Sequence, residues 1–434
     1  TQYDYIVMNP PFVSAKALDD VQKGSLKAIL GDTLRNRPDL SQAFITKSLG
    51  LLKSGGRLGT LMPSGVTNSS FGESWRRTIN KECDIRLVAL FGAFDMFHSA
   101  MVNVCCLVVD KQKSEQTPVQ MIWAEPSRSA AAAAMRGIRH WSAGERIERS
   151  AEGWSGYSIV SDVFDKRASW MPAPNALGSI LPKMESAIPT VVTDMFNIEL
   201  GIRAGDRSLF VIDKALFDKF GQKERKYFKP VAEKDAIRNG RVWPSNFIFY
   251  PDQPTSVEQL RTLTPVFYRE RVAPRNFSDD FRLELARPRY AAASKRGPRI
   301  VSRAFAGPGA FAVDEVGDFA VVQGYVWTLK KHVDASADRL IDYSLIFNSS
   351  VFIGITREFS VIQAGGQIDL AKRYMKNVPL PDLEELYANR PEVADYAASL
   401  RSRALESMPD PSSLNRFALM VYGVGEREWP LPLN

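Results

Sequence analysis

The chain has 434 residues, of which 45% are hydrophobic and 24% charged, a composition typical of a globular protein with room for two or three domains. It holds no run of about 18 apolar residues and opens on no signal-peptide pattern, so we expect no membrane span and a cytoplasmic location. Its three cysteines and three histidines are too few and too scattered to predict a disulfide framework or a zinc site.

The first predicted element is a short apolar strand over residues 4–8, and it stops at the tetrapeptide Asn9-Pro10-Pro11-Phe12. Proline has no amide hydrogen and restricts the residue before it, so two prolines end a strand abruptly. Residues 38–56 then show apolar residues at helical spacing, with glycines 55 and 56 at the predicted end of that helix.

The chain continues with alternating elements up to about residue 111. We predict a strand over 57–63, a helix over 69–83, and strands over 85–91 and 101–111. This alternation indicates an α/β layer. From about residue 112 the pattern weakens, and the alanine-rich stretch within 127–157 predicts a short helix in a connector. From about residue 180 onward, short strands, glycine and proline turns and helices indicate an α+β domain.

The tetrapeptide at the end of the first strand has the chemistry to hold an amino group. Ligands of doubly wound sheets bind beyond the carboxyl ends of the strands. The side-chain oxygen of Asn9 and the rigidly oriented carbonyl of Pro10 can together accept both hydrogens of a planar amino group, and Phe12 offers a flat face for a base. The alternative is a tight turn that closes a strand with a capping asparagine.

The net charge is +7, and lysine and arginine recur in clusters between about residues 200 and 305. One interpretation is a solvated basic face. The other is a groove for a polyanion, of which duplex DNA or RNA is the commonest.

The tetrapeptide and the segments 43–66 and 85–109 resemble the S-adenosylmethionine-dependent N6-adenine methyltransferases, in which such a motif binds the target amine. The segments 197–212, 226–241, 299–319 and 347–382 resemble the recognition region of large restriction–modification methyltransferases of the gamma motif order (type IIG-like). The resemblance implies catalytic roles for Asn9, Pro10 and Phe12. It also implies that Phe97, or alternatively Phe94, packs on a flipped-out adenine.

The resemblance implies a fold class: α/β, the second half of a Rossmann-like methyltransferase sheet, followed by an α+β target recognition domain. We expect this half-sheet over residues 1–125, a connector over 126–180 and the recognition domain over 181–434. The family binds S-adenosylmethionine with a glycine-rich turn and an acidic residue that precede the tetrapeptide, and four of its seven strands can be placed here. We therefore expect the C-terminal portion of a longer polypeptide that binds the cofactor poorly by itself. Its N-terminal half would lie in the same polypeptide or in a second chain.

Double-stranded DNA is the partner that the resemblance implies. The candidates for DNA contact are Arg203, Arg207, Arg299, Arg303, Lys372 and Arg373. The predicted function is site-specific methylation of adenine N6, with base flipping, in a restriction–modification or phage-defence system. One alternative is a DNA-recognition module without catalytic activity of its own. Another is the same chemistry on RNA or protein, and the long basic second domain argues against the protein-glutamine methyltransferases, which are small.

Overall fold

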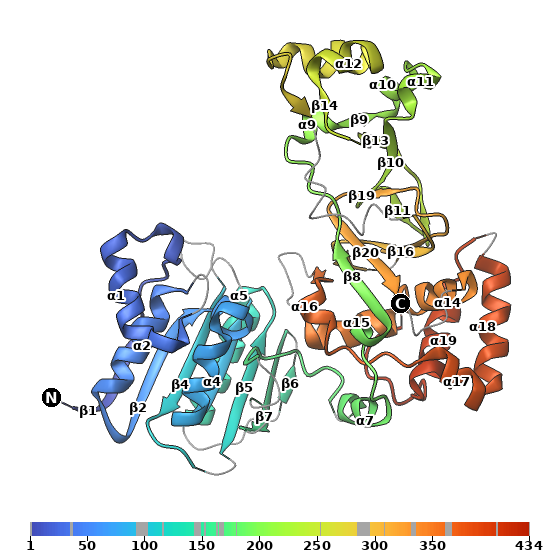
Figure 1. Cartoon of the computed structure of the whole chain (residues 1–434). Helices are drawn as coiled ribbons and strands as arrows, with labels where there is room; N and C mark the ends of the chain where they lie inside the picture. The colour runs from blue at the N-terminus through green and yellow to red at the C-terminus, as the bar shows by residue number, and fades with distance from the viewer. Residues whose placement is uncertain are drawn as a thin grey trace. The chain divides into compact units, whose positions relative to one another are not determined.

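A computed structural model shows how the chain folds. It describes residues 2–34, 38–92, 103–114, 117–142, 149–151, 153–161, 164, 169–178, 180–251, 253–283, 296–307, 309–330, 336–360, 367–404 and 407–433. The chain forms two units, with the boundary in the sequence between Ala176 and Leu177, and Figure 1 shows the elements of each. No helix in the described ranges is long and apolar enough to cross a membrane.

The first unit is built on a seven-stranded mixed sheet, in the order β1-β2-β4-β3-β5-β7-β6. Its strands are β1 (Tyr3–Met8), β2 (Leu52–Pro63), β3 (Asp84–Phe91), β4 (Val104–Asp110), β5 (Pro118–Ala124), β6 (Arg149–Ala151) and β7 (Trp154–Val160). Strand β1 is parallel to β2 and β3 is parallel to β5, whereas β4 is antiparallel to both β2 and β3. The predicted α/β class is confirmed.

Helices cover the two faces of this sheet unequally. They are α1 (Asp20–Leu30), α2 (Leu40–Leu51), α3 (Gly65–Asn68), α4 (Glu73–Glu82) and α5 (Arg128–Ser142). Helices α1, α2 and α4 share one core with β2, β3 and β4. Helix α5 packs on the other face, against β3, β5 and β7. Because successive side chains of a strand point to opposite faces, Val88 lies in the first core and Ala89 in the second.

Two local predictions differ from the structure. Gly55 and Gly56 do not end a helix: α2 ends at Leu51, and both glycines lie inside β2. Gly55 has a φ of +76°, and the ladder to β1 is irregular beside it, so a bulge explains the glycine pair. The stretch that we expected to be a connector also contributes α5, β6 and β7 to the first unit. Gly137 of α5 has no side chain, which lets the ring of Trp154 on β7 pack closely on this helix.

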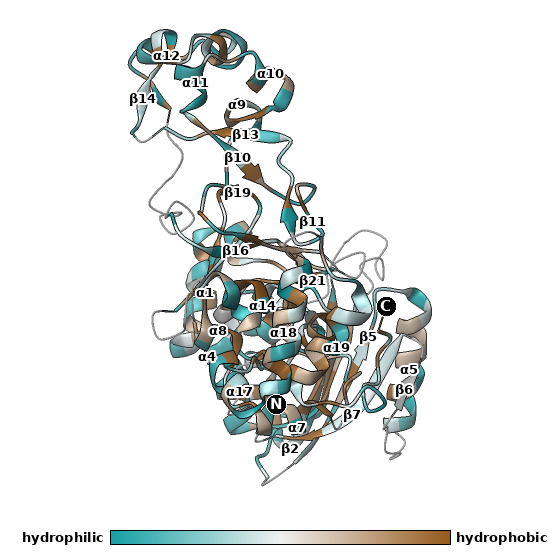
Figure 2. Ribbon diagram, turned by 90° about the vertical axis from the view of Figure 1, so that its right-hand side faces the viewer, coloured by the Kyte–Doolittle hydropathy of each residue, from teal (hydrophilic) through white to brown (hydrophobic). Residues whose placement is uncertain are grey.

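The second unit contains two hydrophobic cores on either side of a four-stranded sheet, in the order β18-β16-β20-β8. These strands are β8 (Phe196–Leu200), β16 (Arg299–Arg303), β18 (Phe311–Asp314) and β20 (Gly324–Leu329). One face places Trp327 in a core with the helices, and the other places Val326 in the core of a β-rich lobe. Figure 2 shows hydrophobic ribbon along strands such as β10 and hydrophilic ribbon on outer helices such as α12.

The remaining elements of the second unit complete these two cores. Its helices are α7 (Ile180–Ala187), α8 (Val192–Met195), α9 (Arg207–Phe210), α10 (Lys214–Asp218), α11 (Gln222–Arg225), α12 (Val257–Leu263), α13 (Pro265–Phe267), α14 (Ala337–Phe347), α15 (Ser350–Phe359), α16 (Lys372–Met375), α17 (Leu383–Asn389), α18 (Pro391–Ala404) and α19 (Pro411–Tyr422). Its further strands are β9 (Val211–Asp213), β10 (Phe228–Ala232), β11 (Ile237–Arg238), β12 (Arg241–Val242), β13 (Asn246–Phe249), β14 (Thr255–Ser256), β15 (Arg282–Leu283), β17 (Phe305–Ala306), β19 (Ala320–Val321) and β21 (Ile368–Asp369).

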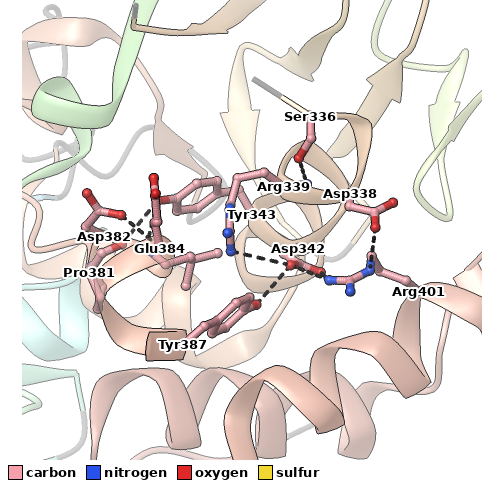
Figure 3. A network of polar contacts seen from close by, with 11 residues as sticks. Ser336, Asp338, Arg339, Asp342, Tyr343, Pro381, Asp382, Glu384, Tyr387 and Arg401 are labelled. Carbon is pink, nitrogen blue, oxygen red and sulfur yellow. Dashed lines mark hydrogen bonds and ion pairs between the residues drawn. The ribbon is translucent and has the colours of Figure 1, made fainter. Parts of the chain in front are cut away.

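A buried polar network joins three of these helices (Figure 3). Asp342 of α14 is fully buried, and both of its oxygens accept hydrogen bonds from Nη1 of Arg401 on α18, at 2.7 and 2.6 Å. The hydroxyl of Tyr387 on α17 donates to Asp342 at 2.9 Å. A buried carboxylate is tolerated only when it is paired in this way, so the network fixes the register of α14, α17 and α18.

Candidate functional site

Asn9 lies immediately after β1, at the carboxyl end of that strand. The ladder pairs Met8 with Thr60 of β2, so the last residue of β1 is held against the sheet. Asn9 is exposed, Pro10 is buried and Phe12 is half-buried. The structure thus presents the asparagine side chain to solvent on a backbone anchored by the buried proline.

The segment that follows the tetrapeptide is fixed against the start of α2. The amide of Leu40 donates to the carbonyl of Val13 at 2.9 Å, and the amide of Ala15 donates to the carbonyl of Pro38 at 3.0 Å. Asp39 caps α2, accepting from the amide of Ser41 at 3.0 Å. Burial raises the pKa of Asp39, although the hydrogen bonds from Ser41 oppose the shift. The corner at Asn9 and Pro10 is therefore held at both ends.

A second loop leaves the same edge of the sheet, because β1 and β2 are parallel and both run to that edge. The amide of Ser64, just after β2, donates to the carbonyl of Asn103 at 2.9 Å, which ties this loop to the start of β4. The buried guanidinium of Arg76 donates from Nη1 to the carbonyls of Val66 at 2.6 Å and Ser69 at 3.0 Å. Burial lowers the pKa of Arg76 to about 10.

Our sequence analysis missed Arg76. Its spacing contains a signal, because Trp75 and Arg76 lie four and three residues before Ile79 on α4, and all three are buried. An arginine on the buried stripe of a helix needs backbone or acidic partners. Here those partners are carbonyls of the loop after β2.

The base-stacking candidate Phe97 and its alternative Phe94 lie outside the described residues. The strands that flank them are described: Phe91, the last residue of β3, pairs with Val104, the first of β4. The carboxyl end of β3 lies at the same edge as those of β1 and β2, because β3 and β2 are both antiparallel to β4.

In the described sheet, β1 is an edge strand whose ladder partner is β2. Its outward side chains Tyr5 and Val7 are 75% and 88% exposed. They line a hollow of about 570 Å³ with Arg57, Cys106 and Trp141, on the sheet face opposite α2. Apolar strands exposed on both an edge and a face are typical of association surfaces.

Two of the six DNA-contact candidates are held inside the second unit. Arg299 is 1% exposed and its Nε lies 3.0 Å from Oδ2 of Asp314, so the prediction that it contacts DNA is corrected: it is a structural residue. Arg303 is half-buried and donates from Nε to the carbonyl of Ile237 at 2.9 Å. The alternation that places these two side chains on one face of β16 turns both toward protein partners.

The other four candidates are exposed. The side chain of Arg203 has no ion pair or hydrogen bond in the described part of the chain, and neither does that of Lys372. Arg207 pairs with Glu233, at 2.7 Å from Nη2 to Oε2. Nη2 of Arg373 lies 3.6 Å from Oδ2 of Asp369, and its Cζ lies 4.6 Å from the centre of the Tyr374 ring. Arg203 and Lys372 are thus the most available of the six for a phosphate.

Comparisons with known proteins indicate which class of protein this chain is similar to. Residues 1–97 match the family model of the Eco57I restriction-modification methylase. The chain is also similar to type II methyltransferases, and the matches confirm its resemblance to restriction–modification DNA methyltransferases.

Three of these relatives show how sequence identity and coverage vary. M.BstVI of Geobacillus stearothermophilus is 22% identical over 58% of this chain and 44% of its own. M.XhoI of Xanthomonas vasicola is 22% identical over 98% of this chain and 76% of its own. M.HincII of Haemophilus influenzae is 30% identical over 44% of this chain and 35% of its own.

Among solved structures, the type IIL restriction-modification enzyme MmeI in complex with DNA is similar in fold, with a TM-score of 0.58 and 12% identity. The similarity covers 97% of this chain and 54% of that one. The chain therefore spans about half the length of MmeI and, in its match, 44% of M.BstVI.

Proposed function

We propose that this chain carries the amine-binding corner and the DNA-recognition region of a site-specific DNA methyltransferase that acts on adenine N6 in duplex DNA. The observation that carries the proposal is the exposed Asn9 at the carboxyl end of β1, next to a buried Pro10, within a segment matched by the Eco57I methylase family. Restriction–modification or phage defence is the biological setting that the relatives favour.

Each group at this corner has a distinct role. The side-chain oxygen of Asn9 and the carbonyl of Pro10 accept hydrogen bonds from the two amine hydrogens, which turns the nitrogen lone pair out of conjugation. Phe12 packs against the extruded base, and Phe97 is proposed for the opposite face. No strong base is needed, because the nitrogen loses its proton after it attacks. S-adenosylmethionine supplies the electrophilic methyl group when it is bound.

The cofactor-binding half is proposed to lie outside this chain, in the same polypeptide or in a second one. The exposed outer edge of β1, with Tyr5 and Val7, supports this proposal, because a further parallel strand pairing there would bury both the edge and the hollow beside it. By itself, the chain is then expected to bind S-adenosylmethionine weakly. The same observation favours a second candidate function, in which this chain alone recognises DNA without methylating it.

The two functions are separated by an experiment on Asn9. The chain is expressed together with the proposed cofactor-binding half, and N6-methyladenine in plasmid DNA is quantified by mass spectrometry. Asn9→Ala is expected to lower methylation by at least 100-fold, about the scale of a lost positioning group, while DNA binding persists. The control Asn389→Ala makes the same change at an exposed position of α17 and is expected to leave methylation unchanged. Full methylation by Asn9→Ala would reject the proposal.

A further inference from the structure

The hairpin β11–β12 of the second unit has a rigid tip. Its ladder pairs Ile237 with Val242 and Arg238 with Arg241. The two turn residues, Asn239 and Gly240, have φ values of +51° and +71°. Two central residues with positive φ form the tight turn that suits the natural twist of a hairpin. Figure 1 labels β11 between β10 and β16 in this unit.

Contacts with the rest of the second unit hold the hairpin in place. Ile237 is fully buried, and its carbonyl accepts the hydrogen bond from Nε of Arg303 at 2.9 Å. The amide of Trp243 donates to the carbonyl of Ala236 at 2.7 Å, which closes the base of the hairpin. A Cβ at position 309 would lie 3.0 Å from the amide nitrogen of Asn239, so the glycine there allows the turn to pack closely. Arg303 is therefore half-buried because it holds the hairpin through the carbonyl of Ile237.

The exposed side of the hairpin carries a cation, Arg238, and a large aromatic residue, Trp243. Arg238 is exposed, and its side chain makes no ion pair or hydrogen bond within the described ranges. Trp243 is 53% exposed. Both flank the turn, and a hollow of about 470 Å³ beside it is lined by Asn239, Arg241 and Trp243.

Two acidic groups near the hairpin are already engaged. Glu233 holds Arg207 at 2.7 Å and accepts from Nδ2 of Asn246 at 2.5 Å. Asp410, on the far side of the hollow, accepts from the amide and the hydroxyl of Ser413 at 2.9 and 2.7 Å. Because the exposed side chain of Arg238 has no ion pair or hydrogen bond among the described residues, its positive charge is available to an anion from outside the protein. A rigid ribbon that displays a cation beside an aromatic ring suits a sugar–phosphate backbone, where the cation meets phosphate and the ring packs on the sugar.

We propose that the hairpin β11–β12 contacts the sugar–phosphate backbone of duplex DNA, with Arg238 on a phosphate and Trp243 against the adjoining sugar. A two-stranded ribbon is narrow enough to follow a groove of the duplex. The inference rests on the proposed function, because it names a contact of the DNA that the chain is proposed to recognise. It adds to the recognition surface two residues that lie outside the six cations predicted from the sequence.

The test measures binding of the whole chain to a fluorescently labelled duplex by anisotropy, over a series of salt concentrations. Arg238→Ala is expected to weaken binding about tenfold at moderate salt and to reduce the salt slope by about 1, equally for duplexes of different sequence. Arg238→Lys keeps the charge and is expected to retain most of the affinity. Trp243→Ala is expected to weaken binding severalfold without a change in the salt slope.

The matched control is Arg427→Ala. It removes the same charge from an exposed position between Glu426 and Glu428 and is expected to leave binding unchanged. Unfolding curves of all variants show whether each remains folded. If the unmodified chain binds no DNA, the proposed function itself fails. If it binds and Arg238→Ala behaves as the control, or loses affinity for one sequence alone, the backbone contact is rejected.

Discussion

Arg299 and Asp314 pair across strands β16 and β18, with Nε 3.0 Å from Oδ2 and side chains that are 1% and 2% exposed. Nη2 of Arg299 also donates to the carbonyl of Phe319 at 2.6 Å, and Oδ1 of Asp314 accepts from the amide of Gly317 at 2.9 Å. The pair thus ties the end of β18 and the turn after it to β16.

Removing one partner of this pair is expected to destabilise the second unit. Asp314→Ala leaves a buried guanidinium without its carboxylate, and we expect a loss of about 3–5 kcal/mol in the free energy of unfolding, measured by urea denaturation. Arg203→Ala, an arginine lost from an exposed loop, should change it by less than about 0.5 kcal/mol. An Arg299→Ala variant as stable as the unmodified chain but deficient in DNA binding would restore a DNA-contacting role to Arg299.

Arg203 and Lys372, whose side chains are available to a phosphate, should affect DNA binding and not stability. Each neutralises at most one phosphate, so Arg203→Ala and Lys372→Ala are each expected to lower DNA affinity and reduce the salt slope by about 1, with little change in stability. Arg207→Ala serves as the comparison, because its guanidinium is engaged by Glu233 at 2.7 Å. If Arg207→Ala weakens binding more than the two other variants, the ranking by availability is wrong.

The sequence predicted the elements that depend on local pattern. The strand before Asn9, the helix that begins after Pro38 and Asp39, and the alternation that follows are all present, since apolar periodicity and caps are properties of neighbouring residues. The position of Asn9 at the carboxyl end of a strand could be predicted for the same reason. Its exposure could not, because exposure depends on which strands pair.

The roles of the arginines needed tertiary contacts. Arg299 belongs to a basic cluster in the sequence, and the cluster gives no sign of its partner Asp314, which lies 15 residues further on and meets it through strand pairing. Arg303 likewise finds its acceptor 66 residues away, at Ile237. Charge patterning along a sequence therefore identifies a basic domain but does not separate its structural cations from those that face a ligand.

Acid should weaken the first unit through Asp84. Burial alone would raise the pKa of this carboxyl, but hydrogen bonds from the amide and hydroxyl of Ser114, at 2.9 and 2.8 Å, outweigh it and hold the pKa below its ordinary value of 3.8. The unfolded chain then binds the proton first. The stability that Asp84 contributes is therefore fully present above pH 3.8 and is lost as the pH falls through the folded-state pKa.

The contribution of Asp84 can be measured by urea unfolding between neutral and acidic pH. Ser114→Ala removes one hydrogen bond to the carboxylate and should cost about 1 kcal/mol at neutral pH, with a smaller loss on acidification. Asp84→Asn cannot titrate, so the part of the acid sensitivity that comes from this group should vanish. Equal acid sensitivity in Asp84→Asn and the unmodified chain would assign the effect to other carboxyl groups.

Two helical glycines of the first unit should respond to alanine with opposite signs. Gly50 is exposed on α2, and a Cβ added there would meet no atom within 4 Å, whereas a Cβ at Gly137 of α5 would lie 2.7 Å from the ring of Trp154. Gly50→Ala removes the entropic cost of glycine in a helix and should stabilise by about 0.5–1 kcal/mol. Gly137→Ala gains the same helix propensity, but it pushes a buried indole that is 6% exposed, so a net loss of about 1–3 kcal/mol is expected in urea unfolding. Because the two substitutions are chemically identical and both lie within helices, the difference between them isolates the packing of α5 on β7. A stabilised Gly137→Ala would mean that α5 does not pack on Trp154 as the sheet of the first unit requires.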